Sequence, residues 1–145
     1  MKFKVEIPFV HHLGFELLRF EKGEAEIAVE LRPELENSWG VAHGGVTMTL
    51  LDVAMAHAAR SPGDDGVAEL SGVVTIEMKT SFMRPGLGRL VATGRRLHRT
   101  ASFAFCEASM TDAEGQLLAH STGTFKFLKG LPAGGKRILR TEASD

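Results

Sequence analysis

Residues 44–60 form an apolar stretch that few folds can accommodate. Its hydrophobic side chains would occupy every side of a helix: Val46, Met48, Leu50, Leu51, Val53, Ala54, Met55 and Ala58. The stretch is long enough for about four to five helical turns, and the segment Ser61-Pro62-Gly63 is typical of a helix end. A helix that is apolar nearly all round is buried rather than laid on a surface. We therefore predict a central helix from Gly44 to about Arg60 that the rest of the chain covers.

The rest of the chain has the patterns of β-strands. Residues 8–18 predict a short helical turn that runs into a strand, and residues 24–31 alternate acidic and apolar side chains until Pro33. Val74, Ile76 and Met78 then alternate with polar residues in a strand over 73–82. Turn-forming segments at 84–86, 98–101 and 112–115 separate it from further strands at 90–97, 102–111 and 116–128. One buried helix among five or six antiparallel strands is an α+β plan in which a sheet wraps the helix.

Length and composition fit one domain. The chain has 145 residues, 43% of them hydrophobic, and we expect a domain over 1–130 followed by a flexible tail over 131–145. The net charge of −1 argues against nucleic-acid binding. A single cysteine, Cys106, excludes an internal disulfide and is expected to be a core residue. No signal peptide or membrane-spanning stretch is evident, so we expect a cytoplasmic protein without a membrane partner.

Two polar features lie at the start and in the middle of the predicted helix. The Gly44-Gly45 pair leaves backbone N–H groups at a helix start, where the helix dipole adds partial positive charge. A strongly polarised or anionic oxygen suits that position. Asp52 places a carboxylate inside the apolar run, where an ionisable group is rare unless it has a use. Amides that polarise an electrophile and one carboxylate are the groups that hydrolysis of an activated ester needs.

Over about residues 8–128 the chain resembles the hotdog-fold acyl-CoA thioesterases, in particular their 4-hydroxybenzoyl-CoA/phenylacetyl-CoA thioesterase-like branch. The resemblance is carried by Asn37, Gly40, His43-Gly44-Gly45, Asp52, Thr75 and Phe82-Met83-Arg84-Pro85. His-Gly-Gly alone is a weak motif. Its specificity comes from an Asn six residues before His43 and an Asp nine residues after it. The resemblance implies a helix wrapped by a sheet, two protomers that pair edge to edge, and active sites at their interface.

The resemblance also implies the reaction, which is hydrolysis of an acyl-CoA thioester to a free acid and CoA. The N–H of Gly44, with Gly45 near it, would polarise the carbonyl and hold the oxyanion. Asp52 would act as general base on a water or attack directly, and both paths stay open. Asn37 and His43 would set the geometry of the loop and of the leaving sulfur. Thr75 would help to place the water.

Spacing along the helix favours a dimer. Asp52 follows His43 by nine residues, which is about 13 Å of helical rise. A carboxylate at that distance cannot meet a carbonyl held by the Gly44 and Gly45 amides of the same chain. We therefore expect Asp52 of one chain to act with the Gly-Gly segment of a second chain that runs oppositely. A homodimer is the minimum, and a homotetramer built as a dimer of dimers is left open.

The substrate is less constrained than the reaction. Aryl-acetyl and medium fatty acyl groups both fit a pocket lined by Phe9, Phe15, Met48, Met55 and Phe82. Residues 78–106 hold six Lys and Arg side chains and no Asp or Glu, which favours the phosphates of CoA as a partner. Arg84 and Arg99, the latter in the 98–101 turn, are the candidates. A solvated sheet face would carry the same pattern.

Other site types are not supported. The histidines have no spacing that makes a metal site with a carboxylate, so neither a metal nor a cofactor is expected, since CoA belongs to the substrate. No Gly-x-Ser-x-Gly segment is present, which excludes a serine hydrolase. Two alternatives remain. A hotdog dehydratase or hydratase would use a paired histidine and carboxylate around a different loop, and a non-catalytic acyl-CoA-binding module would not need Asp52.

Overall fold

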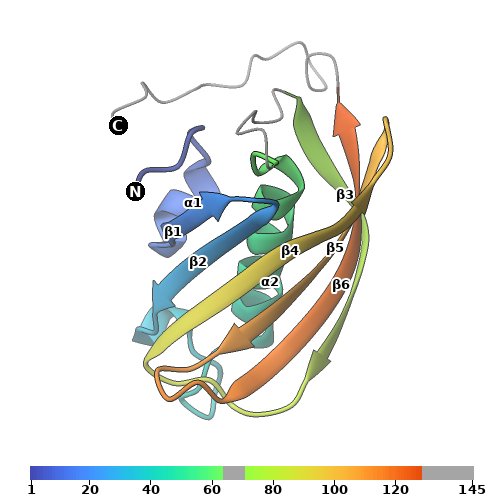
Figure 1. The fold of residues 1–145 in the computed structure, drawn as a ribbon. Helices are drawn as coiled ribbons and strands as arrows, with labels where there is room; N and C mark the ends of the chain where they lie inside the picture. The colour runs from blue at the N-terminus through green and yellow to red at the C-terminus, as the bar shows by residue number, and fades with distance from the viewer. Residues whose placement is uncertain (64–70, 129–145) are drawn as a thin grey trace.

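Six antiparallel strands curve around one long helix in the computed structural model, which describes residues 1–63 and 71–128 (Figure 1). The order is α1 (Pro8–Leu13), β1 (Glu16–Glu21), β2 (Glu24–Glu30), the short 3-10 helix η1 (Pro33–Leu35), α2 (Gly44–Arg60), β3 (Gly72–Phe82), β4 (Arg89–Arg99), β5 (Phe103–Thr111) and β6 (Leu117–Leu128). The expected α+β plan with a wrapped helix is confirmed. The flexible tail predicted for 131–145 lies outside the described residues.

The sheet has the order β1-β2-β4-β5-β6-β3, with every neighbouring pair antiparallel. Strand β3 follows α2 in the chain but pairs with β6, so it lies at the edge opposite β1 (Figure 1). Helix α2 lies on the concave side of the sheet and contacts all six strands. None of the helices in the described residues could span a lipid bilayer.

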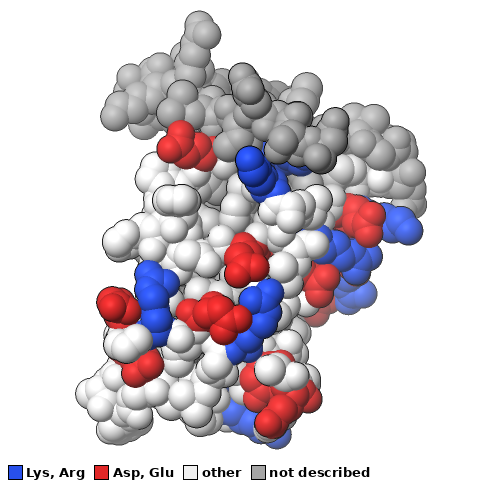
Figure 2. All heavy atoms as spheres, turned by 90° about the vertical axis from the view of Figure 1, so that its left-hand side faces the viewer, with Lys and Arg blue, Asp and Glu red and all other residues white. Residues whose placement is uncertain are grey.

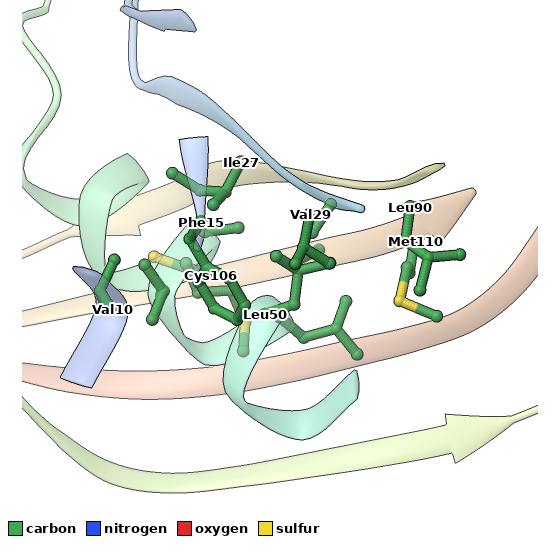
Figure 3. Close-up of a cluster of buried hydrophobic side chains, with 14 of the residues drawn as sticks. Val10, Phe15, Ile27, Val29, Leu50, Leu90, Cys106 and Met110 are labelled. Atoms are coloured by element: carbon green, nitrogen blue, oxygen red, sulfur yellow. The ribbon is translucent and has the colours of Figure 1, made fainter. Parts of the chain in front are cut away.

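Helix α2 and the concave face of the sheet enclose the core (Figure 3). The helix contributes fully buried side chains, among them Leu50, Leu51 and Met55. The sheet contributes Ile27, Val29, Leu90, Cys106, Met110 and Phe125. Burial raises the pKa of the Cys106 thiol to about 12, so it stays protonated at neutral pH. The prediction that Cys106 is a core residue is confirmed.

Two strands differ from the sequence prediction. Strand β4 continues through Arg99 because Arg99 still pairs with Ala104, and a bulge between Arg96 and His98 absorbs an extra residue. The predicted turn at 98–101 is therefore displaced. Thr100 closes it, because its N–H donates to Phe103 O at 2.7 Å and its Oγ1 accepts from the Phe103 N–H at 3.0 Å.

In β3 a bulge between Thr75 and Glu77 interrupts the alternation of faces. Thr75 bonds to α2, and Met78 packs against the core beyond the bulge. Val74 and Ile76 are exposed, although the alternation of apolar and polar residues in this strand predicted that they face the core. An edge strand with exposed apolar side chains is a surface on which another strand can pair.

Gly94 of β4 is where the sheet comes closest to the helix. A Cβ at this residue would collide with the backbone carbonyl of Ala54 in α2. We predict that Gly94→Ala lowers the free energy of unfolding by about 2–3 kcal/mol, because backbone cannot move aside as a flexible side chain can. Urea denaturation would measure the change. Ser109→Thr adds one methyl group to a residue of β5 that is only partly buried and should change stability by less than about 0.5 kcal/mol. Equal stabilities of the Gly94→Ala variant and the wild type would contradict this packing.

Candidate active site

The first turn of α2 has one backbone donor that nothing in the described residues satisfies. The Nδ1 atom of His43 accepts the N–H of Gly45 at 2.8 Å, and the carbonyl of His43 accepts the N–H groups of Val46 and Thr47 at 2.9 and 3.1 Å. His43 is therefore the N-cap of the helix. The Gly44 N–H has no partner in the described part of the chain, and this partly exposed amide is the group that remains to bind an oxygen.

Asn37 shapes the loop that leads into this helix. Its Oδ1 accepts the N–H of Trp39 at 2.9 Å and that of Val41 at 3.4 Å. Its own N–H donates to the carbonyl of Val41 at 2.8 Å, so the loop is closed from both sides. With its oxygen used in this way, Asn37 keeps the two N–H donors of its side-chain amide for another group.

Asp52 lies two turns further along α2 and is half-buried. The hydroxyl of Thr75 on β3 donates a hydrogen bond to Asp52 Oδ1 at 2.7 Å. Burial raises the pKa of this carboxyl above its ordinary value of 3.8, and the Thr75 hydrogen bond offsets part of that increase. A carboxylate that holds a proton more readily is a better base for a water molecule near neutral pH.

The predicted site residues thus form two groups that one chain does not bring together. Asn37, His43, Gly44 and Gly45 lie at the start of α2, and Asp52 lies with Thr75. Eight residues separate Gly44 from Asp52, which is about 12 Å along the helix. Strand β3 runs alongside α2 in the opposite direction. A Cβ placed on Gly44 would be 3.6 Å from Phe82 at the end of β3, whereas Asp52 bonds to Thr75 near its beginning.

The two predicted CoA-phosphate residues have other contacts. Arg84 donates from Nη1 to the carbonyl of Leu117 at 2.8 Å and shares a hollow with the carboxylates of Asp112 and Glu114. Arg99 is the last residue of β4 and not part of a turn. Its guanidinium lies 4.2 Å from the centre of the Phe127 ring.

Several other arginines of the 78–106 segment are paired with side chains or backbone of neighbouring elements. Arg89 contacts the carboxylates of Glu16 and Glu30. Arg95 bonds to Glu107 at 2.6 Å. Figure 2 shows positive and negative side chains intermixed on the face seen there. The one-sign run in the sequence does not give a one-sign surface at these positions, because adjacent strands supply acidic residues.

The residues proposed for an acyl pocket are dispersed. Phe15 and Met55 are buried in the core, and Phe9 is exposed at the surface. Met48 is partly buried on α2. Phe82 is 57% exposed and lies near Gly44. The set therefore does not line a single cavity.

Some roles were not evident from the sequence. Arg96 donates from Nη1 to the carbonyls of Ala59 and Ser61 at 3.0 and 3.1 Å and so caps the C-terminal end of α2. His57 is buried inside the same helix. Neither role has a local sequence signal, because both depend on which strand packs across the helix.

Comparison with known proteins identifies relatives across most of the chain. The family described as the thioesterase superfamily matches residues 40–119. The medium/long-chain acyl-CoA thioesterase YigI of Escherichia coli (strain K12) is 31% identical over 136 residues, which cover 85% of this chain and 87% of that protein.

Solved structures show the same fold. A point mutant of the phenylacetic acid degradation protein PaaI from Thermus thermophilus is 31% identical to this chain with a TM-score of 0.73, covering 84% of this chain and 100% of that one. PaaI of E. coli has a TM-score of 0.75 at 21% identity and covers 84% of this chain and 85% of its own. At that identity the likeness shows the fold alone. The expected hotdog fold is confirmed.

The raised pKa of Asp52 predicts a pH-dependent cost in stability. The folded chain binds this proton more tightly than the unfolded chain does, so stability falls as pH rises from 3.8 through the folded pKa. Asp52→Asn should therefore raise the free energy of unfolding at pH 7, and the gain should shrink as the pH approaches 3.8. Thermal unfolding of both proteins across this range measures it. A gain that is the same at all pH values would contradict the assignment.

Proposed function

This chain belongs to the thioesterase superfamily, and we propose that it hydrolyses acyl-CoA thioesters to the free acid and CoA. The observation that carries the proposal is Asp52, a half-buried carboxylate that accepts a hydrogen bond from Thr75. It lies in the helix that begins at Gly44, whose N–H has no partner among residues 1–63 and 71–128. A relative with 31% identity over most of both chains is named a medium/long-chain acyl-CoA thioesterase, which supports the substrate class.

The geometry supports a general-base path. Asp52 would take a proton from a water molecule while the water oxygen bonds to the thioester carbonyl carbon. The Gly44 N–H would stabilise the oxyanion, and the helix dipole would add to its effect. The C–S bond then breaks, and the CoA thiolate takes up a proton. Direct attack by Asp52 would give an anhydride that water hydrolyses afterwards, and the structure is compatible with both paths.

The loop residues would support this chemistry. In the neutral His43 ring, the nitrogen that accepts from Gly45 carries no proton, so Nε2 carries it and can donate to the leaving sulfur. The amide nitrogen of Asn37 is a further side-chain donor of the loop. The Thr75 hydroxyl keeps Asp52 in place.

The homodimer is part of the proposal. β3 is the last strand of the sheet and carries exposed apolar side chains, with Ile76 53% exposed. If two β3 strands pair in antiparallel fashion about a point between Met78 and Lys79, Thr75 of one chain lies opposite Phe82 of the other. Because these residues lie beside Asp52 and Gly44 respectively, that register would bring Asp52 of one protomer to Gly44 of its neighbour.

One side of helix α2 is left partly exposed to solvent as a stripe of side chains, and this dimer would cover it. Met48, Thr49, Asp52, Ala56 and Arg60 are only partly buried, in contrast to the core side of the helix. They recur at helical spacing and so form one side of it. A second protomer would bury this stripe. Formation of a tetramer from two such dimers, the CoA-phosphate roles of Arg84 and Arg99, and a cytoplasmic location stay predictions.

The alternatives are less well supported. A non-catalytic acyl-CoA-binding module would gain nothing from a desolvated carboxylate beside the ligand, because Asp52 would repel the anionic parts of CoA. A dehydratase or hydratase would need a histidine paired with the carboxylate, and in the described residues Asp52 is paired with Thr75.

Removing the base should abolish turnover while the fold is retained. We predict that Asp52→Asn lowers kcat for acyl-CoA hydrolysis by about 10²–10⁴-fold, because Asn cannot accept the proton. Release of free thiol from a panel of acyl-CoA esters measures the rate. Glu26→Gln is the matched control, because it makes the same chemical change on a β2 carboxylate that accepts from the Thr93 hydroxyl, and it should retain wild-type turnover. Near-normal rates in Asp52→Asn would reject the mechanism.

Mixing two inactive variants tests whether each site draws on two chains. Gly44→Val should fold, because a Cβ at Gly44 only touches the exposed Phe82 ring, but its bulk would block the amide. When Asp52→Asn and Gly44→Val chains are unfolded and refolded together in equal amounts, random pairing makes about half of the dimers mixed, and each mixed dimer has one intact site. About a quarter of wild-type activity should return. No recovery despite mixed dimers would place the site within one chain.

A further inference from the structure

A small pocket lies directly beyond the Asp52–Thr75 pair. Its volume is about 190 Å³, and its lining includes Ala56 and His57 of α2, Val73 of β3, and Val5 and Ile7 of the N-terminal segment. Ala56 is one helical turn after Asp52, and Val73 precedes Thr75 by two residues and so lies on the same face of β3. Arg60 also lines the pocket, and the aliphatic side chains of the lining suit hydrocarbon.

His57 is a polar residue of that lining that is 95% buried and has one unsatisfied atom. Its Nδ1 lies 2.8 Å from the carbonyl of Val53. A carbonyl can only accept, so Nδ1 carries the proton, and in the neutral ring Nε2 is left as an acceptor. Burial lowers the pKa of His57 to about 4, which keeps the ring neutral at physiological pH. Nε2 has no hydrogen-bond partner in the described part of the chain.

The contacts of the described neighbours of His57 leave its Nε2 without a donor. The rings of Phe3 and Phe20 pack edge-on against the imidazole, with centroids at 5.2 and 6.0 Å. The Nε of Arg60, which also lines the pocket, donates to the carbonyl of Ser71 at 3.2 Å. A buried acceptor without a donor destabilises the chain, and a hydroxyl supplied by a ligand would remove that cost.

The position of His57 indicates how long such a ligand must be. His57 follows Asp52 by five residues, which is about 7.5 Å of rise and about 140° around the helix. A ligand cannot pass through the helix, so it would follow the helix surface. At about 5 Å from the axis an arc of about 140° is about 12 Å long, and together with the rise it makes a path of about 14 Å. An extended acyl chain advances by about 1.25 Å per carbon, so roughly eleven to twelve carbons cover that path.

We propose that this pocket receives the distal end of the acyl group and that His57 Nε2 accepts a hydrogen bond from a hydroxyl there. The preferred substrates are then medium-chain acyl-CoA esters with a hydroxyl at or near the far end of the chain. This inference rests on the proposed thioesterase function and adds the acyl group to it. It assigns His57 a role in specificity and none in the chemical step.

A matched pair of substrates tests the proposal. Dodecanoyl-CoA and 12-hydroxydodecanoyl-CoA differ by one hydroxyl, and the readout is the ratio of their kcat/KM values. We expect the wild type to favour the hydroxylated ester by about tenfold, because the unsubstituted chain leaves Nε2 unpaired. In His57→Leu the preference should disappear or reverse. A wild-type ratio near one, or a ratio unchanged in His57→Leu, overturns the proposal.

Two further variants separate this role from a general effect of substitution. His98→Leu makes the same change at an exposed histidine that stacks on Phe105 and should keep the wild-type ratio. His57→Gln retains an acceptor oxygen and should keep part of the preference for the hydroxylated ester. Complete loss of that preference in His57→Gln would count against the hydrogen bond.

Binding to the Asp52→Asn variant gives a result that does not depend on turnover. Isothermal titration with the two esters should give about tenfold tighter binding of the hydroxylated one, and equal Kd values overturn the proposal. If both esters bind with this difference but the wild type releases no thiol from any ester, the thioesterase function fails and the pocket assignment stands. If thiol is released from both esters at equal efficiency, the function stands and the pocket assignment fails.

Discussion

Burial of helix α2 is the constraint on which the rest of the structure depends. Its side chains are apolar on nearly every side, and a single sheet can cover only part of a helix. The sheet covers the side that carries Leu50, Leu51 and Met55, and packing is so close at Gly94 that no side chain fits between strand and helix. The stripe through Asp52 and Ala56 stays partly open. The part of the helix that the sheet leaves uncovered is where the chemistry lies.

The periodicity of hydrophobic residues was sufficient to predict the long helix and the strands. It did not predict strand ends and strand faces that depend on pairing with neighbouring strands. The helix was predicted to begin at Gly44, and it does, because an apolar run after two glycines is a strong local signal. The end of β4 was placed at Leu97, and the pattern could not show that pairing with β5 continues to Arg99. The faces of β3 were misjudged for a similar reason, since a bulge at an edge strand leaves no mark in an alternating sequence.

The candidate site could be predicted residue by residue but not as a set of contacts. Asp52 could be predicted because burying a carboxylate in an apolar run costs free energy. The structure adds that Thr75 is its hydrogen-bond partner. The capping contact of His43 with Gly45 leaves the Gly44 N–H without a partner in the described part of the chain, and residue types alone do not distinguish the two glycines. The run of arginines in residues 78–106 suggested a positively charged surface. In the structure an acidic residue of the neighbouring strand pairs with such an arginine, as Glu107 does with Arg95, and the sequence does not show which strands are neighbours.

Three groups of this chain are in environments that disfavour them. Asp52 is desolvated, the N–H of Gly44 lacks a partner in the described residues, and so does the Nε2 of buried His57. The buried groups of Asp52 and His57 cost free energy in the isolated chain, and the partly exposed Gly44 N–H is left to water. Features of this kind are relieved when a second chain and a ligand supply what is missing. The amide fits the oxygen of a polarised carbonyl, and the carboxylate fits an attacking water. The imidazole nitrogen, about 140° further around the helix, fits a hydroxyl at the far end of an acyl chain that bends around α2.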